Sequence, residues 1–592
     1  MIKKLKSGKY LLNFVLVIVI GIAFLFGGLA ISFVLLRLLP GDPVLCLLPP
    51  GPFTPAEYQM IAHLYGFDQP IFIQFLRYIL DFFSGNWGNS CALAPGLPVN
   101  DILRTTIPRT IEVLSVPLLI GVALGFLFGR ISNRTKHNWL KMGIQLLTAL
   151  LLALPIIFVG LLFQLTLGYL VPLLPVTGYK SPAFSDPTFI TGFRLLDSLI
   201  SGRWDLLGDT LLHYILPGLI LTVAITALMT RVFSSKMTED AYKRNTILSN
   251  TAKTSAVFGI IFTYFILVDV IFNLYGFGSR FVTAFMMFDY FLLRAFIFVF
   301  IILYVIILIV SNLTFSIISL LKDKKQPLKV VEDAVEREPK TTIIIDLKNY
   351  SNKIIRSPIT LIGLVAIIIT IVVSIFAELI SGYSFNGALG IYLGPWEPPS
   401  PDHPLGTANF GRDVLALILY GTGDALIFGI GAVIVGLIGG LIFGLLAQIH
   451  RVVRTIIMSF TLIFYVLPGI LIVMFLVGSI GRLFGLLMIA TGFLLIPSFS
   501  RIIANAEFKI VLIGKKVLAY IPLFIGFSIL FYLSLGFLGY GDPYTIQLGA
   551  LISVGRTHLY DAPWASLWPG FMAFLIVVSF FVLHEGLAKH SR

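Results

Sequence analysis

Long apolar runs separated by short polar turns make up most of this chain. Each run has about 20 residues or more, enough for a helix to cross about 30 Å of hydrocarbon. We therefore predict an all-α polytopic membrane protein with about twelve transmembrane helices. The predicted spans are 11–37, 110–129, 142–172, 211–233, 255–275, 290–321, 358–380, 420–448, 455–481, 484–504, 517–540 and 565–588.

The composition supports this prediction. Charged residues make up only 12% of the 592 residues, hydrophobic residues make up 57%, and the mean hydropathy is +0.96. A soluble domain carries about twice that share of charged residues. The composition therefore excludes a soluble globular protein.

The net charge of +13 does not indicate a nucleic-acid-binding protein, because no folded basic domain is visible. Most of the 42 Lys and Arg residues instead fall in the tails and turns that share one side when the spans alternate. Cytoplasmic loops carry such a positive excess. We predict a multi-pass protein of the cell membrane, with the lipid bilayer as its surroundings, both termini in the cytoplasm and no nucleic-acid partner.

One long polar segment divides the chain. Residues 322–356 are rich in charges of both signs and are predicted to form a cytoplasmic linker. Six predicted spans precede it in residues 1–321, which also contain a large outer loop at 38–109. Six further spans follow it in residues 357–592. We refer to residues 1–321 and 357–592 as the first and second halves.

The two halves contain similar motifs in the same order. LLIGVALGFLFG at 118–129 corresponds to VIVGLIGGLIFG at 433–444, and LALPIIFVGLLF at 152–163 corresponds to YVLPGILIVMFL at 465–476. Because six is an even number, corresponding helices run in the same direction, and the repeat is parallel. Substrate paths commonly lie between such repeats, so we expect a path at the interface of the two halves.

Several polar stretches resemble permease subunits of the peptide and nickel ABC importers. HPLGTANFGRDVLALILYG at 403–421 and LSLGFLGYG at 533–541 resemble one permease subunit of these importers. LLPGDPV at 38–44, the segment 66–90 and TIPRTIEVL at 106–114 resemble the other subunit. The resemblance implies that the chain is a fusion of the two permeases.

The resemblance also implies a function. The chain would be the permease component of an importer for peptides or similar small solutes, with translocation at the interface of the two halves. Separate ABC ATPase subunits would supply the energy, and an extracellular solute-binding protein would deliver the substrate. One alternative is a transport-inactive scaffold or receptor with the same fold, and another is a transporter that works without ATP.

Two inner loops depart from the family pattern. In the family, each permease has a loop with a Glu-Ala-Ala pattern and a following Gly, which seats in the ATPase subunit. The loops at 230–255 and 500–520 are shorter and lack this continuation. They would either form a minimal ATPase contact or have lost the coupling. The residues predicted for a minimal contact are Glu239, Tyr242, Lys243, Glu507 and Lys509.

The outer loop of the first half contains an amphipathic pattern. Apolar residues recur at helical spacing within DQPIFIQFLRYILDFF, from Ile71 through Tyr78 to Phe82. This pattern predicts a helix that lies at the membrane interface. The segment would serve either as part of a docking surface for the external solute-binding protein or as a cap over the ends of the spans.

Acidic residues inside spans are costly unless they are paired or face water. Glu112, Glu378 and Glu585 lie near predicted span ends, where interfacial water would solvate them, whereas Asp269 lies deeper. Asp269 is therefore the candidate for a polar path, the alternative being a purely structural role.

Cys46 and Cys91 are the only cysteines, and both fall in the loop at 38–109. On an oxidising outer side they would form one disulfide. Two unrelated free thiols remain the alternative, because the sequence does not supply the separation of the two Cα atoms.

The sequence does not indicate an enzyme. It contains no G-x-x-x-x-G-K-[ST] loop, no G-x-S-x-G elbow and no H-E-x-x-H motif. No pair of His or Cys has metal-ligand spacing. We expect no catalytic residue, metal or cofactor in this chain, with ATP bound and hydrolysed by partner subunits.

Overall fold

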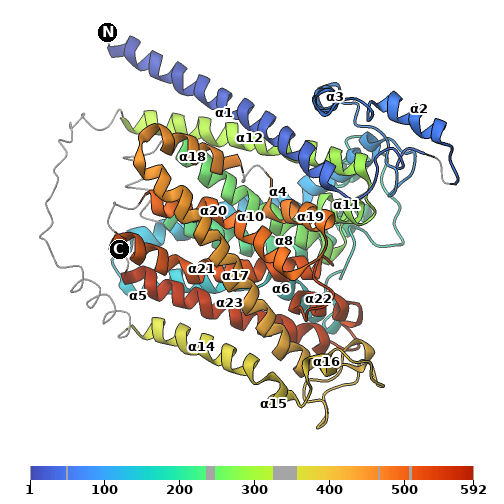
Figure 1. Ribbon diagram of the computed structural model, residues 1–592, viewed down its shortest axis with the longest axis vertical. Coiled ribbons are helices and arrows are strands. Elements are labelled where there is room, and N and C mark those ends of the chain that lie inside the picture. The colour runs from blue at the N-terminus through green and yellow to red at the C-terminus, as the bar shows by residue number, and fades with distance from the viewer. Residues whose placement is uncertain are drawn as a thin grey trace, which may run out of the picture.

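The computed structural model describes residues 2–48, 51–234, 247–323, 357–463, 467–505 and 510–590. These residues form helices joined by loops, with long helices lying side by side in one bundle (Figure 1). Ten of the described helices are long and apolar enough to cross a membrane, and an eleventh span is counted if one bent pair forms a single span. The chain is an all-α polytopic membrane protein.

Ten of the twelve predicted spans each correspond to one long helix, in order, whereas the predicted spans 142–172 and 455–481 fall on pairs of shorter helices. In the first half these helices are α1 (Ile2–Leu38), α4 (Val99–Arg134), α5 (Asn138–Ala153), α6 (Ile156–Phe163) with the π-helix η1 (Gln164–Leu170), α8 (Trp204–Ser234), α10 (Ile247–Phe272) and α12 (Tyr290–Asp323). In the second half they are α14 (Pro358–Ile375), α17 (Val414–Ile449), α18 (Arg451–Ile463), α19 (Gly469–Ile480), α20 (Phe484–Ala504), α21 (Ile510–Phe537) and α23 (Trp564–His590).

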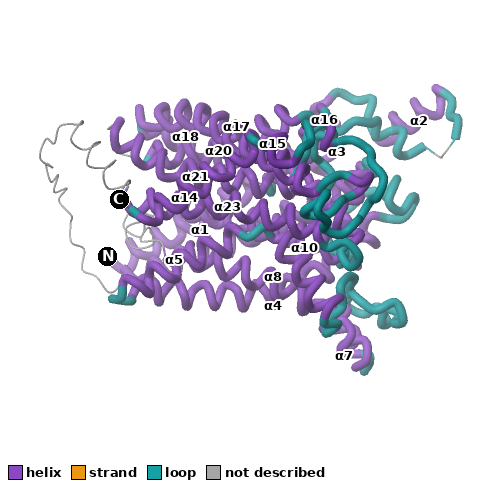
Figure 2. Tube along the Cα trace, turned by 90° about the horizontal axis from the view of Figure 1, so that it is seen from below, coloured by secondary structure: helices purple, strands orange, loops and turns teal. Residues whose placement is uncertain are grey.

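The loops gather at one end of the bundle, and both chain termini lie at the other (Figure 2). We call these the loop-rich end and the terminal end. The loop-rich end carries the short helices, among them α2 (Pro55–Tyr65), α3 (Ile71–Ser84), α7 (Arg194–Ile200), α11 (Phe277–Met286), α15 (Ala377–Ser381), α16 (Phe385–Ala388) and α22 (Leu548–Gly555).

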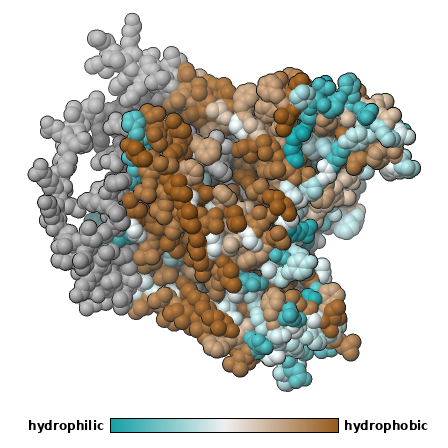
Figure 3. Space-filling view, viewed as in Figure 1, coloured by the Kyte–Doolittle hydropathy of each residue, from teal (hydrophilic) through white to brown (hydrophobic). Residues whose placement is uncertain are grey.

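Apolar side chains cover the visible flank of the bundle, whereas polar side chains concentrate at the loop-rich end (Figure 3). Leu119 of α4 and Ile442 of α17 are 73% and 55% exposed. A soluble protein rarely leaves such a large apolar band uncovered. The band therefore marks the surface that contacts lipid.

The third span of the first half is broken. We predicted one helix over 142–172, but α5 ends at Ala153 and α6 starts at Ile156, with a bend of 83° between the two parts. Pro155 lies at the break. Proline lacks an N–H group, and it disfavours helical geometry at the preceding residue. In the second half, Pro468 similarly precedes α19, although residues 464–466 before it lie outside the described part of the chain.

Close helix contacts repeat between the two halves. In the first half, a Cβ atom built on Gly121 of α4 would lie 2.8 Å from the Cβ of Ile225 in α8. A Cβ atom built on Gly129 of α4 would lie 2.6 Å from the Cβ of Phe233, also in α8. Glycines at a spacing of four residues let two membrane helices approach at backbone distance. Both helices start at the loop-rich end, so α4 and α8 run side by side in the same direction.

The second half uses the same arrangement. A Cβ on Gly436 of α17 would lie 2.6 Å from the Cβ of Leu495, and one on Gly444 would lie 2.7 Å from the Cβ of Ile503, both in α20. In addition, the first span packs on the last span in each half, α1 on α12 and α14 on α23. The repeated motifs of the sequence thus correspond to repeated helix contacts.

Candidate functional site: the interface between the halves and the loop-rich end

Aromatic side chains join the two halves near the loop-rich end. Phe285 of α11 meets Phe475 of α19 edge to face, with 5.0 Å between the ring centroids, and it meets Tyr540 at 5.3 Å. Gly478 lies next to this contact, and a Cβ atom there would lie 2.8 Å from the Phe285 ring. The halves are therefore closely packed at this level, which leaves no open path between these rings.

The halves also touch further along the bundle. Gly570 of α23 lies against Phe158 of α6, since a Cβ on Gly570 would lie 2.5 Å from that ring. At the terminal end, Arg231 of α8 forms an ion pair with Glu585 of α23, with 2.7 Å between Nη2 and Oε1. The two side chains are only 31% and 19% exposed. Glu585, which we assigned to interfacial water, therefore has a partner in the other half.

The position of Arg231 is repeated in the second half. Arg231 lies two positions before Phe233, the residue that packs on a glycine of α4. Arg501 lies two positions before Ile503, which packs on the equivalent glycine of α17. Arg501 interacts electrostatically with Tyr304 of α12, the last span of the first half. Arg231 and Arg501 thus occupy equivalent positions beside the glycine contacts of the two halves. Our sequence analysis missed these two arginines, because the chain between the glycine motif and the fourth span differs in length between the two halves, so that aligning the motifs does not align Arg231 with Arg501.

Asp269 is fully buried near the end of α10. Its carboxylate accepts hydrogen bonds from the backbone N–H of Gly276 at 3.1 Å and of Ser279 at 2.8 Å. It also accepts one from the Ser279 hydroxyl at 3.2 Å. These bonds hold the start of α11, the helix that carries Phe285. Whether Asp269 also lines a polar path stays a prediction.

The predicted ATPase-contact residues lie outside the described part of the chain. Glu239, Tyr242 and Lys243 fall in 235–246, and Glu507 and Lys509 fall in 506–509. The linker prediction likewise falls mostly on undescribed residues, at 324–356. These predictions stay open.

Cys46 and Cys91 are bonded to each other in the structure, with their Cα atoms 5.4 Å apart. The chain next to Cys91 is fixed by Asp289, which is fully buried. The Asp289 carboxylate accepts hydrogen bonds from Ser90 Oγ at 2.5 Å and from the N–H groups of Cys91 at 3.2 Å and Leu93 at 3.0 Å. The disulfide therefore ties the segment after α1 to a loop that is itself anchored on the start of α12.

Helix α3 is seen end-on in Figure 1, so its axis runs across the long axes of the spans. Its polar side chains turn toward the protein: Asp81 pairs with Arg294 at 2.8 Å, and Gln74 donates to the Phe67 carbonyl at 2.9 Å. Its exposed face is apolar, with Phe72 and Leu80 67% and 66% exposed. The predicted interfacial helix thus has its apolar face exposed at the edge of the bundle.

The turn at 403–415 caps α17. Asp413 accepts a hydrogen bond from the N–H of Ala416 at 2.7 Å and pairs with His403 Nδ1 at 3.0 Å. The Trp564 indole donates to the Thr407 carbonyl at 3.0 Å and so ties the turn to α23. This polar sequence between two spans is therefore a rigid cap at the loop-rich end.

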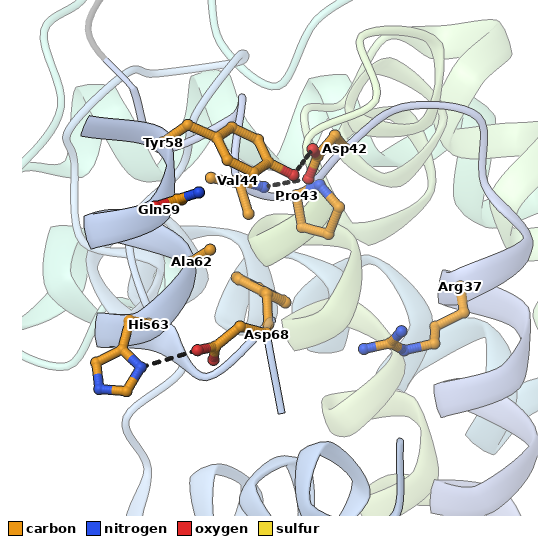
Figure 4. Close-up of a pocket in the computed structure, with 10 residues that line it drawn as sticks. Arg37, Asp42, Pro43, Val44, Tyr58, Gln59, Ala62, His63 and Asp68 are labelled. Atoms are coloured by element: carbon orange, nitrogen blue, oxygen red, sulfur yellow. Dashed lines mark hydrogen bonds and ion pairs between the residues drawn. The ribbon is translucent and has the colours of Figure 1, made fainter. Parts of the chain in front are cut away.

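A cavity of about 610 Å³ lies between the end of α1, helix α2 and the chain that joins them (Figure 4). Arg37 lies on one side of this space, across from Asp42 and Asp68. Tyr58 donates a hydrogen bond to Asp42, and His63 pairs with Asp68 at 2.8 Å. The sequence analysis did not single out these residues, because they come together only when α2 folds back over the end of α1.

No group of three or more His, Cys, Asp or Glu residues in the described ranges is arranged to hold a metal ion.

No family model matches the chain. Among the curated proteins, the probable D,D-dipeptide transport system permease DdpB of Escherichia coli (strain K12) is 33% identical over 214 residues, which are 36% of this chain and 62% of that protein. Two dipeptide transport system permeases of Alkalihalophilus pseudofirmus also match. DppB is 26% identical over 36% of this chain and 63% of its own length, and DppC is 27% identical over 42% of this chain and 90% of its own length.

The chain resembles a fused pair of peptide ABC permeases. It is about twice as long as these relatives, and each match covers less than half of it. The relatives are transport permeases and not enzymes. Together with the apolar helices, they place this chain among the multi-pass proteins of the cell membrane.

Proposed function

We propose that this chain supplies both membrane-spanning permeases of an ABC importer for peptides or similar small solutes. The observation that carries the proposal is that DppB and DppC of one organism both resemble this single chain. The repeated glycine contacts, in which Gly129 and Gly444 occupy equivalent places, support it from the structure. The first and second halves would each supply one permease.

The loop-rich end would face the outside and the terminal end the cytoplasm, in keeping with the positive charge of the tails and turns at the terminal end. An external solute-binding protein would dock on the loop-rich end. The rigid turn around Asp413 and the loop held by Asp289 give this end a fixed shape. A fixed surface is suited to a protein partner because less flexibility is lost on docking.

Transport would proceed by alternating access between the halves. Phe285 and Phe475 would separate to admit substrate at the loop-rich end, and Arg231 and Glu585 would separate to release it at the terminal end. ATP would act only through partner ATPase subunits, because a nucleotide shifts a conformational equilibrium only through contacts that differ between the states. This chain would bind no cofactor of its own.

The proposal is tested by purifying the tagged full chain from its native membranes and identifying its companions by mass spectrometry. We expect ATPase subunits in stoichiometric amounts. Reconstitution of that complex should then give ATP-dependent uptake of short peptides into proteoliposomes. Recovery of the chain without any ATPase, together with absent uptake, would refute an ATP-driven importer and favour the scaffold.

A further inference from the structure

The cavity at the loop-rich end carries opposite charges on opposite walls. Arg37, from the last turn of α1, reaches into the space from one side (Figure 4). Asp42 and Asp68 lie across from it, and Tyr58, Gln59 and His63 complete the polar lining. The volume of about 610 Å³ falls within the range of roughly 300–1,000 Å³ that is typical of small-molecule sites.

Local contacts fix the charges on the acidic wall. The hydrogen bond with His63 holds the pKa of Asp68 below its ordinary value, so this side chain stays a carboxylate at neutral pH. The hydrogen bond to Asp42 raises the pKa of Tyr58, so the phenol stays neutral. The wall therefore presents the side chains of Asp42 and Asp68 together with the Tyr58 hydroxyl.

Arg37 has no carboxylate partner among the described residues. Its guanidinium lies over the Phe33 ring, 5.1 Å from the centroid, and it is exposed to the cavity. It also lines a second cavity of about 320 Å³, which shares Phe67 with the first. A guanidinium in this setting can bind a carboxylate through two parallel hydrogen bonds.

The walls of the cavity are pre-organised. Helix α2 begins with a capping box, in which Thr54 accepts from the N–H of Glu57 at 3.3 Å and Glu57 accepts from the N–H of Thr54 at 2.7 Å. The helix ends at Gly66, which has the left-handed φ of 72° that glycine adopts without strain. The Cys46–Cys91 disulfide ties down the chain between α1 and α2. A site that is ordered before binding loses less entropy when a ligand enters.

We propose that this cavity binds a soluble zwitterion, a short peptide or an amino acid, with its carboxylate on Arg37 and its ammonium group on Asp42 and Asp68. The two aspartates would repel a simple anion, and the arginine would repel a simple cation. Only a ligand with both charges matches both walls. The site lies in the outer loop, away from the interface between the halves. The class of ligand rests on the proposed function, whereas the site itself rests on the geometry.

The test is direct binding of the dipeptide Ala-Ala to the full chain in phosphatidylcholine nanodiscs, measured by isothermal titration calorimetry without ATPase. We expect saturable binding, and binding about tenfold weaker or worse for N-acetyl-Ala-Ala and for Ala-Ala amide, because each lacks one charged end. Arg37→Gln and Asp68→Asn should each cause a similar loss. Arg104→Gln is the matched control, since Arg104 lies at the same end, pairs with Asp101 at 3.5 Å and does not line the cavity.

Each outcome decides the inference. No Ala-Ala binding at millimolar concentration, equal binding of the blocked dipeptides or full affinity in Arg37→Gln would overturn it. The inference would also be overturned if the cavity held only an ethanolamine phospholipid that remained through purification. The zwitterion in the cavity would then come from the bilayer and not from solution. Binding without ATP-driven uptake would leave the cavity assigned and the importer refuted. ATP-driven uptake without Ala-Ala binding in the cavity would support the importer and refute the proposed binding site.

Discussion

Gly444 of α17 lies against Ile503 of α20 so closely that a side chain on Gly444 has no room. A Cβ atom there would lie 2.7 Å from the Cβ of Ile503 and 3.1 Å from the Ser500 carbonyl oxygen. Gly129 and Phe233 stand in the same relationship in the first half. This contact sets how closely the second and fourth spans of each half approach.

Gly444→Ala should therefore destabilise the protein by about 1–3 kcal/mol, the usual cost of overpacking a close contact. Thermal unfolding in detergent, followed by intrinsic fluorescence, measures the effect. Gly259→Ala is the matched control in α10, because no heavy atom lies within 4 Å of a Cβ at that site. The control should be neutral or slightly stabilising, since Ala favours helix. Equal stability of the two variants would show that the contact is looser than described.

Arg231 and Glu585 should be energetically coupled across the two halves. We expect a double-mutant cycle with Arg231→Gln and Glu585→Gln to give a coupling free energy of about 1 kcal/mol, because the pair is only partly exposed. The exchange Arg231→Glu with Glu585→Arg should recover part of the lost stability. Additive effects of the two single variants would mean that the ion pair does not join the halves.

Asp269→Ala should loosen α11 rather than the whole bundle. It removes the acceptor for the N–H groups of Gly276 and Ser279, at a cost of about 1–3 kcal/mol for buried donors left unpaired. Hydrogen exchange of residues 277–286 should speed up, while Asp561→Ala, an exposed acid at the same end, should leave it unchanged. If Asp269 also lines a polar path, Asp269→Asn should lower peptide uptake while α11 stays protected from exchange.

Asp197 should make the loop before α7 sensitive to acid. Its burial raises its pKa, but hydrogen bonds from the Thr191 hydroxyl and from the N–H groups of Thr191, Ile190 and Gly192 outweigh this and hold the pKa below the ordinary 3.8. A lowered pKa contributes stability above the unfolded value, and this contribution is lost as the pH falls below about 3.8. Proteolysis at residues 190–203 should increase over that range. In Asp197→Asn the same segment should be equally accessible at neutral and acidic pH.

Cys46 and Cys91 should resist alkylation until a reductant is added, and mass spectrometry of the purified chain measures this. The bond closes a sequence separation of 45 residues, so replacing both cysteines by Ser should cost about 2–4 kcal/mol in the outer loop. The double replacement should also weaken Ala-Ala binding, because the disulfide no longer holds the cavity wall in place. Alkylation of both thiols without reductant would show that the bond does not form in the cell.

The spans were predictable from the sequence because hydropathy is a local property. A run such as residues 211–233 is apolar enough to cross a membrane whatever lies beside it, and α8 covers that run. The repeat was visible for a similar reason, since the glycines around Gly129 and Gly444 recur at fixed spacing. We predicted that Asp269 lies deep in its span, but the structure places it near the end of α10, where it holds the start of α11.

The prolines show that local sequence does not decide whether a helix breaks. Pro155 breaks the third span, whereas Pro217 and Pro497 lie inside continuous helices. The residue type is the same in each case, so the neighbouring helices and loops decide whether the backbone bends.

The sequence by itself determined the all-helical membrane architecture, the order of the spans and the resemblance of each half to a permease. Only the tertiary structure decided that Arg231 meets Glu585, that Asp81 of α3 turns inward to Arg294, and that Arg37 faces Asp42 and Asp68 across a cavity. The physical reason is that apolar runs respond to the bilayer one helix at a time. Pairing of charges depends on which helices pack together, and that is settled by the whole chain.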